Sequence, residues 1–551
     1  GVKFSRILLP AVVFTFFVQN KSLTAIGTPG SFLLKSGFVF LKLATGLIGF
    51  WICPYAIGHG FGERYDLPVP LWLWVIGAGA TIVLTFAVIV LFPHSRALHP
   101  QGPRINLFRV RGLRGLAHPI TISVIRVLSV IFLLASVLSG FLGVPDPYQN
   151  LVPVAVWVVW WVGVAYVCAL VGDLWAVLNP FRTLFSWAEK IVNLLTGGKC
   201  LSLEKPYPQG LSAWPAVAGL MVFFWAELIW PAGGVPWDLA LAITIYAAMT
   251  WTGMVVFGRD VWLQNADAFS LVFGVFARFA PLALRSVDRE QIRTCVSPAC
   301  RYRQDYCVNG QICLARAGPG DLEWILRPPA FGLLDEPRVP VSLMVLVITL
   351  LATVTFDGIL ETPLWTHVLE RTLSDEARYV GTVALIMFSM GFLMVFLGFS
   401  WLMAYCAQRF GDPQSLGTAP RPDLFHVAST FVMTLVPIAI AYHLAHYLSY
   451  LVISGQYLIP RLSDPLGNGW NLLGTRDYQV DISLLGARAA WYLAVAFILA
   501  GHVFAVYIAH LAALRLFGNP RAAFFSQIPM MVLMVLYTML SLWILAQPMV
   551  S

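Results

Sequence analysis

Charged residues are scarce in this chain. Asp, Glu, Lys and Arg make up 11% of its 551 residues, whereas hydrophobic residues make up 59%. About a quarter of the residues in a soluble globular domain are charged. The scarcity therefore excludes a soluble globular protein, and repeated apolar stretches of about 20 residues predict an all-α, polytopic transmembrane helix bundle.

Acidic residues are absent from the first loop predicted on the inner side, which carries Arg96, Arg104, Arg109, Arg111 and Arg114. Arginine in short loops between apolar spans marks the cytoplasmic side of a membrane. The net charge of +8 therefore reflects topology. We expect the lipid bilayer as a partner and no nucleic acid.

Cysteine is also too rare, at eight residues, for a disulfide scaffold. Four cysteines form a secondary candidate metal site in an arginine-rich loop that we expect in the reducing cytoplasm: Cys295, Cys300, Cys307 and Cys313. Four, six and five residues separate them, which matches neither a paired zinc motif nor a common ferredoxin motif. Two disulfides or ordinary thiols remain alternatives.

Residues 33–58 have the pattern of a secretory signal, with Lys35 first, an apolar stretch next and small residues at Ala56 and Gly58. Cleavage would leave His59 at the N-terminus, where its amine and imidazole favour copper. The alternative is an uncleaved anchor helix. Residues 1–32 fit neither role.

Ten membrane spans are predicted after the signal. This divides the chain into an N-terminal extension with signal or anchor (1–58), a first membrane half (59–284), a cytoplasmic loop (285–339) and a second membrane half (340–551). We read residues 174–191 and 261–284, which are apolar but interrupted by polar residues, as interfacial or half-inserted helices. The spans begin near Pro70, Pro119, Leu151, Trp214, Pro236, Pro340, Tyr379, Leu424, Ala487 and Ala522.

Ionisable residues inside apolar spans usually mark a ligand, proton or metal site. His443 and His446 are three residues apart and therefore share one helical face. Asp357 and His502 are expected at related depths, and Pro437 is expected to kink the helix before His443. We therefore predict a divalent metal site, for zinc or copper, with His443, His446, His502, Asp357 and His59 as its ligands.

Two other readings of these residues stay open. A transmembrane histidine can simply hydrogen-bond a neighbouring helix. His443 and His502 could instead be the axial ligands of a haem. Glu227 could extend a polar pathway, whereas Asp238, which follows Pro236 and Trp237, could only cap a helix.

Six motifs from residue 59 onward carry a resemblance to a known family: His59–Trp72, Thr355–Gly358, Tyr442–Tyr447, Asp464–Gly467, Gly469–Trp470 and Gly501–Val503. Together they resemble bacterial integral membrane proteins named fenitrothion hydrolases. The resemblance implies hydrolysis of an organophosphorus triester by a bacterial inner-membrane enzyme, but it supplies no catalytic residue.

The sequence thus favours a membrane-embedded, metal-assisted hydrolase of apolar organophosphorus triesters, with the catalytic residues Asp357 and His446 in the extracytoplasmic half. A bound ion would activate water, and Asp357 would be a ligand or general base. The second hypothesis is a transporter or channel for a metal ion, proton or small solute that uses the same residues. The third is a copper or haem redox protein.

Overall fold

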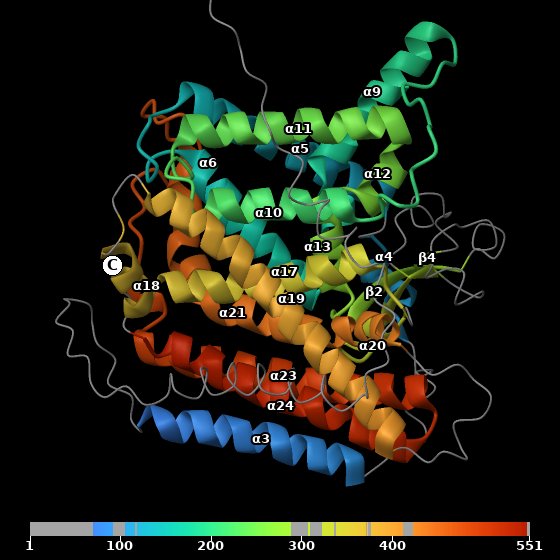
Figure 1. Cartoon of the computed structure of the whole chain (residues 1–551). Coiled ribbons are helices and arrows are strands. Elements are labelled where there is room, and N and C mark those ends of the chain that lie inside the picture. Colours follow the sequence, from blue (N-terminus) through green and yellow to red (C-terminus); the bar gives the residue numbers. More distant parts are fainter. Residues whose placement is uncertain are drawn as a thin grey trace, which may run out of the picture. The chain divides into compact units, whose positions relative to one another are not determined.

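A computed structural model shows a bundle of α-helices (Figure 1). It describes residues 70–91, 105–115, 118–287, 307–308, 322–335, 338–370, 372, 376–410 and 423–547. The signal, His59 and three of the four loop cysteines lie outside these residues, while Cys307 forms part of a strand. The described part of Glu63–Ser551 belongs to one compact unit.

Nine helices of the described part are long and apolar enough to cross a membrane, which confirms the polytopic all-α fold. The tenth expected span, α10 (Trp214–Leu228), has 15 residues. At 1.5 Å per residue it measures about 22 Å, less than the roughly 30 Å hydrocarbon core. The nine are α3 (Leu71–Leu91), α5 (Pro119–Leu142), α6 (Leu151–Pro153) continued by η4 (Val154–Val164) and α7 (Ala165–Leu170), α11 (Pro236–Phe257), α17 (Val341–Leu360), α19 (Ala377–Phe410), the span Leu424–Ser463 that begins with α20 (Leu424–Phe431) and ends with α22 (Leu458–Ser463), α23 (Ala487–Phe517) and α24 (Pro520–Leu545).

Short helices fill the two interrupted stretches. α8 (Trp175–Leu178) and α9 (Pro180–Thr196) occupy the first, and α12 (Arg259–Asn265) and α13 (Ala268–Ala277) the second. α13 has ten residues, too few to cross, and packs against α7 and α10. Their placement at a membrane surface stays a prediction. α18 (Pro363–Glu370) and three short 3-10 turns complete the helices: Leu107–Arg109 with α4 (Arg111–Arg114), Phe331–Leu334 and Ile482–Leu484.

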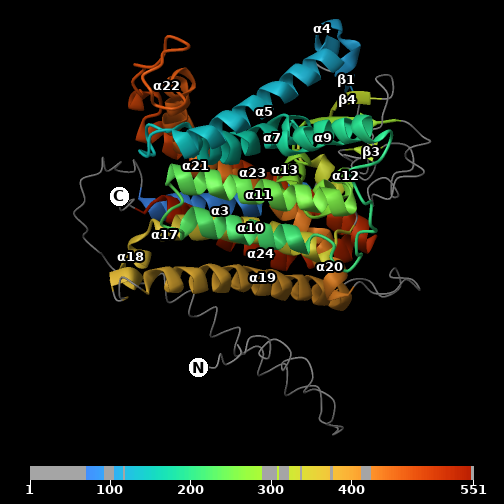
Figure 2. The same cartoon turned by 90° about the horizontal axis from the view of Figure 1, so that it is seen from above.

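A small antiparallel sheet, in the strand order β1-β4-β2-β3, joins two distant loops. It lies at the end of the bundle where α12 and α20 are found, opposite α18 (Figure 2). Residues 285–339, predicted as a cytoplasmic loop rich in Cys and Arg, thus contribute strands. They are β1 (Ile105–Asn106), β2 (Leu282–Ser286), β3 (Cys307–Val308) and β4 (Leu322–Leu326).

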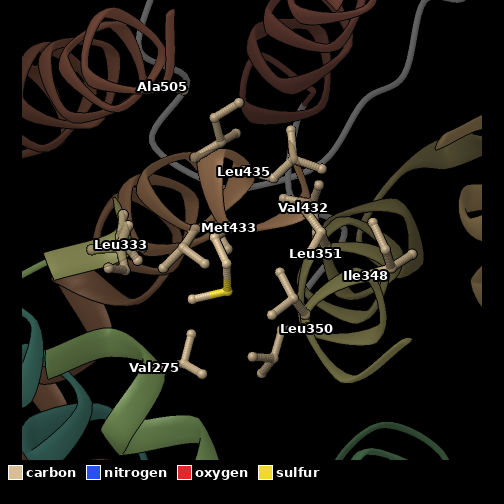
Figure 3. Packing of buried hydrophobic residues seen from close by; sticks show 14 of the residues in the cluster. Val275, Leu333, Ile348, Leu350, Leu351, Val432, Met433, Leu435 and Ala505 are labelled. Atoms are coloured by element: carbon tan, nitrogen blue, oxygen red, sulfur yellow. The ribbon is translucent and has the colours of Figure 1, made fainter. Parts of the chain in front are cut away.

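Two spans form the centre of the bundle: in an apolar stretch of 18 residues from each span, 78% of the residues are buried in α17 and in Leu424–Ser463, against 11% in α5. Their side chains interdigitate in the core shown in Figure 3, where Leu350 and Leu351 of α17 lie near Val432 and Met433. Asp357 of the first span and His443 and His446 of the second are therefore mostly enclosed by the protein. Side chains of α5 such as Val124 and Leu128 are exposed and suited to lipid.

The span that carries the two histidines is irregular where the sequence predicts a kink. Residues Val432–Leu435 (η6) adopt 3-10 geometry, and α21 (Val436–Ile453) follows with Pro437 in its first turn. Proline lacks the N–H that would continue the helical hydrogen bonds. The same span ends in η7 (Ser454–Tyr457) and α22 (Leu458–Ser463).

A glycine allows α21 and α23 to cross closely. A Cβ atom on Gly501 would lie 2.3 Å from the Cβ of Ala441 and 2.7 Å from the carbonyl oxygen of Pro437. Only a residue without a side chain permits this approach. The crossing fixes the position of the next residue, His502, inside the bundle.

Candidate functional site

Three helices bring two carboxylates, a histidine and a tyrosine together. Asp357 lies in the last turn of α17, Glu227 in the last turn of α10, and His446 and Tyr447 are consecutive on α21. α17 packs against both α10 and α21. We call Glu227, Asp357, His446 and Tyr447 the Asp357 cluster.

Hydrogen bonds connect the four side chains in a chain. His446 Nε2 lies 2.9 Å from Asp357 Oδ2. The hydroxyl of Tyr447 donates to the same oxygen at 2.7 Å, and it lies 3.3 Å from Glu227 Oε1. Asp357 therefore accepts from two sides, as an ionised carboxylate can.

The number of available protons constrains Glu227. A tyrosine hydroxyl has one proton, and the shorter contact assigns it to Asp357. The contact between Tyr447 and Glu227 is then satisfied when Glu227 carries a proton and donates it to the tyrosine oxygen. The second oxygen of Glu227, Oε2, is buried and has no hydrogen-bond partner among the described residues. The geometry thus suits a protonated Glu227 beside an ionised Asp357.

The Asp357 cluster is buried but not sealed. The side chains of Asp357 and His446 are 15% and 19% exposed, and Tyr447 is 8% exposed. Glu361 follows α17 by one residue. Partial burial and the negative charge of Asp357 raise the pKa of Glu361, and His446 acts in the opposite direction. Glu361 therefore marks the edge of the cluster.

His443 lies apart from the carboxylates, in a cage of aromatic rings. Its ring centre is 5.4 Å from that of Trp161, 6.0 Å from Tyr166 and 4.7 Å from Tyr447. Its Nε2 atom has no partner among the described residues, and the residue is 2% exposed. Although His443 and His446 share a helical face, only His446 contacts Asp357.

The two histidines of α23 have separate partners. His502 Nδ1 lies 2.8 Å from the carbonyl oxygen of Ile498, and His510 Nδ1 lies 3.2 Å from Gln527 Oε1. These partners do not include Asp357. A histidine whose Nδ1 is held by a carbonyl has the orientation of many metal ligands, and Nε2 of His502 is unpartnered among the described residues.

Within the residues that the structure describes, no group of three or more His, Cys, Asp or Glu side chains is arranged to hold a metal ion. Of the predicted ligands, Asp357 and His446 contact each other. His443 lies among aromatic rings, and His502 is hydrogen-bonded to the carbonyl oxygen of Ile498. His59, Cys295, Cys300 and Cys313 lie outside the described residues, and the side chain of Cys307 does too. Zinc or copper binding stays a prediction.

Sequence reasoning missed Tyr447, because an aromatic residue is ordinary in a membrane helix. Its position beside His446, at the end of the motif Tyr442–Tyr447, is a signal that the sequence offers. Glu227 carried a clearer signal as an acidic residue within an apolar stretch. The partnership of Glu227 with Asp357 depends on packing between α10, α17 and α21, which no local pattern specifies.

No protein-family model, curated protein or solved structure matches this chain. The resemblance to fenitrothion hydrolases therefore stays a prediction, and the function is argued from the Asp357 cluster.

Proposed function

We propose that this protein is a membrane transporter that takes up and releases a proton at the Asp357 cluster. The observation that carries the proposal is the continuous chain of hydrogen bonds from His446 through Asp357 and Tyr447 to Glu227. Carboxylates and histidines in chains of this kind are the usual proton-binding groups of pumps and transporters.

The chain contains the parts that proton binding needs. The contact between His446 and Asp357 holds one proton between a nitrogen and an oxygen. Glu227 holds a second one next to Tyr447, whose hydroxyl can donate to one neighbour while it accepts from the other. Loss of the Glu227 proton would place two negative charges on either side of Tyr447. Such repulsion favours renewed proton uptake or the entry of another cation.

The sidedness of the Asp357 cluster follows from the loop charges and belongs to the proposal. Arginine-rich loops such as residues 92–118 favour the cytoplasmic side. β1, in that loop, pairs with β4, in the segment before α17, so both lie on the same side and α17 runs outward. Its last turn, with Asp357, then lies in the extracytoplasmic half of a bacterial inner membrane. Protons would reach the cluster from outside the cell.

Proton flux into sealed vesicles tests the proposal. The purified protein is reconstituted with a pH-sensitive dye inside, and a proton gradient is imposed. Wild-type vesicles should acidify faster than protein-free vesicles, and Asp357→Asn should abolish the difference. Glu370→Gln is the matched control, because Glu370 pairs with His367 at 3.1 Å but has a side chain that is 63% exposed. Wild-type flux equal to that of protein-free vesicles would contradict proton transport.

A hydrolase is the second candidate, and the Asp357–His446 contact is the observation that favours it. A carboxylate that orients a histidine is a common arrangement for a general base. His446 would take a proton from water, and Asp357, held in place by the hydroxyl of Tyr447, would stabilise the resulting imidazolium. An apolar triester of the fenitrothion type would reach the partly exposed pair from the bilayer.

Turnover in detergent separates the two functions. A hydrolase releases nitrophenol from fenitrothion without a sealed compartment, whereas a transporter needs vesicles. A His446→Gln variant that loses nitrophenol release, beside an active His367→Gln control, would favour the hydrolase. Elemental analysis of the same samples tests the proposed zinc or copper ion. Since Nε2 of His446 contacts Asp357, an ion bound by His446 through that nitrogen would have to displace the carboxylate or share it.

A further inference from the structure

Three arginines come together from α5, α9 and α12. Arg126 belongs to α5, Arg182 to α9 and Arg259 to α12, and we call them the arginine group. α9 and α12 lie at the end of the bundle that carries the sheet (Figures 1 and 2). In the proposed topology this end faces the cytoplasm, because the arginine-rich loop 92–118 contributes a strand to the sheet.

Two members of the arginine group have acidic partners, and the third has none. Arg182 lies 3.1 Å from Asp260 Oδ1, and Arg259 lies 3.4 Å from the same oxygen. Arg259 also lies 2.6 Å from Glu189 Oε2. Among the residues that the structure describes, no ion pair and no hydrogen bond reaches the guanidinium of Arg126. The group thus has three positive charges and pairs with two negative ones.

Arg126 lies at the border between the packed face and the lipid face of α5. Ser129, one turn further along the helix, donates to the carbonyl oxygen of Leu178 in α8 at 2.5 Å, and α5 also packs against α9. Val130, on the same face, is 4% exposed, whereas Val127, next to Arg126, is 42% exposed. The side chain of Arg126 therefore has protein on one side and room for lipid on the other.

The charges around Arg126 repel it. Arg182 and Arg259 both act on Arg126 through space, and each opposes its positive charge. Asp173 acts on Arg182 but does not act noticeably on Arg126. An anion bound at Arg126 would offset this repulsion and accept charge-assisted hydrogen bonds from the guanidinium.

The depth of Arg126 suits a contact with the phosphate layer of a bilayer. α5 has 24 residues and measures about 36 Å, slightly more than the hydrocarbon core of about 30 Å. Arg126 is the eighth residue of α5, so its Cα lies about 10 Å from the start of the helix. A long arginine side chain can reach the headgroups from that depth and keep its charged end at the interface.

α9 extends the same surface away from the bundle. The first half of α9 is largely buried, but Leu194 and Leu195 in its second half are 83% and 79% exposed. Trp187 and Lys190 are exposed as well. Helices with exposed apolar side chains, an aromatic ring and lysine lie in the headgroup region and are attracted to anionic lipids. The arginine group is therefore joined to a helix that suits the same depth.

We propose that the arginine group is a binding site for the phosphate of an anionic phospholipid in the cytoplasmic leaflet. Arg126 contacts the phosphate, and its planar guanidinium offers two parallel donors to the phosphate oxygens. Arg182 and Arg259 remain paired with Asp260 and add their positive field. The acyl chains lie along the exposed face of α5, which a free phosphate ion would leave uncovered. Basic sites between helices on the cytoplasmic side bind such headgroups.

Thermal unfolding of the purified full-length protein tests this site. The midpoint is measured in phosphatidylcholine mixed micelles to which phosphatidylglycerol is added stepwise. A lipid that binds only the folded state raises the midpoint, so the wild-type midpoint should rise and saturate. Arg126→Gln should need at least about tenfold more phosphatidylglycerol for half of this rise, because it loses hydrogen bonds to a charged group. In phosphatidylcholine alone Arg126→Gln should be at least as stable as wild type, since the change removes a repelled charge.

A matched control and a second variant complete the test. Arg378→Gln changes an exposed arginine near the start of α19 and should respond to phosphatidylglycerol as wild type does. Arg126→Lys keeps the positive charge but loses the planar pair of donors, so its response should lie between those of wild type and Arg126→Gln. It also decides the matter if Arg126→Gln does not fold.

Three outcomes would overturn the proposal. The first is a wild-type response to phosphatidylglycerol in both Arg126 variants. The second is a response to inorganic phosphate as large as that to phosphatidylglycerol, which would indicate a site for a free anion. The third is a lower midpoint for Arg126→Gln than for wild type in phosphatidylcholine alone, which would indicate a packing role for Arg126. The measurement uses no proton gradient, so its result is independent of the proposed proton transport.

Discussion

The contact between Asp357 and His446 should couple the two residues energetically, and a double-mutant cycle measures that coupling. Two unit charges 2.9 Å apart attract by about 6 kcal/mol at the effective dielectric constant of about 20 that suits proteins. Removing both groups from water offsets most of this attraction. A hydrogen bond to a charged group contributes about 1.5 to 3 kcal/mol net. We therefore expect a coupling of about 2 kcal/mol between Asp357→Asn and His446→Gln.

The exposed pair of His367 and Glu370 is the internal reference. Its atoms are 3.1 Å apart, but its side chains are 67% and 63% exposed. Water and salt screen such a pair, and exposed pairs contribute about 0.2 to 1 kcal/mol. The free energy of unfolding is measured in mixed micelles for each single and double variant of both pairs. A coupling at Asp357 and His446 no larger than at the exposed pair would refute the reasoning.

Three further changes have expected outcomes. Tyr447→Phe removes the 2.7 Å hydrogen bond to Asp357. It should lower the free energy of unfolding by about 1.5 to 3 kcal/mol and abolish proton flux. Unchanged stability and unchanged flux would contradict the role of Tyr447 as a bridge between Asp357 and Glu227. Gly501→Val would press on Ala441 and should destabilise the purified protein by about 1 to 3 kcal/mol or more, whereas an unchanged unfolding midpoint would contradict the close crossing. Burial raises the pKa of Asp173, which precedes α8, from 3.8 to about 6. Between these two pH values the folded state binds a proton that the unfolded state has lost. The free energy of unfolding therefore falls by up to about 3 kcal/mol as the pH rises through 6. The stability of Asp173→Asn relative to wild type should therefore be greater at pH 7.5 than at pH 4.5. Identical pH profiles of the unfolding midpoint for the two proteins would contradict this effect.

The spans could be predicted from the sequence because their length and apolarity are local properties. α19 begins at Ala377 and α24 at Pro520, within two residues of the predicted starts. Helix starts are also local, since proline fits the first turn: α5, α9, α11 and α24 all begin at one. α10 is shorter than predicted because it ends at Leu228, before Pro231 and the glycines that follow it.

The Asp357 cluster was only partly predictable. The pattern placed Asp357 and His446 at related depths, but the partners of His443 and His446 depend on which helices face α21. α17 and α10 bring carboxylates to one part of α21, while Trp161 and Tyr166 enclose His443. The pairing of strands in the sheet could not be predicted from local sequence either, because β1 and β4 are separated by more than two hundred residues.

Proton flux into reconstituted vesicles tests the central claim most directly, with wild type, Asp357→Asn and Glu370→Gln compared at equal protein density. Our account predicts acidification that is faster than in protein-free vesicles for wild type and Glu370→Gln, and no acidification above that background for Asp357→Asn. Equal flux for wild type and Asp357→Asn would contradict the assignment of Asp357 as a proton-binding residue.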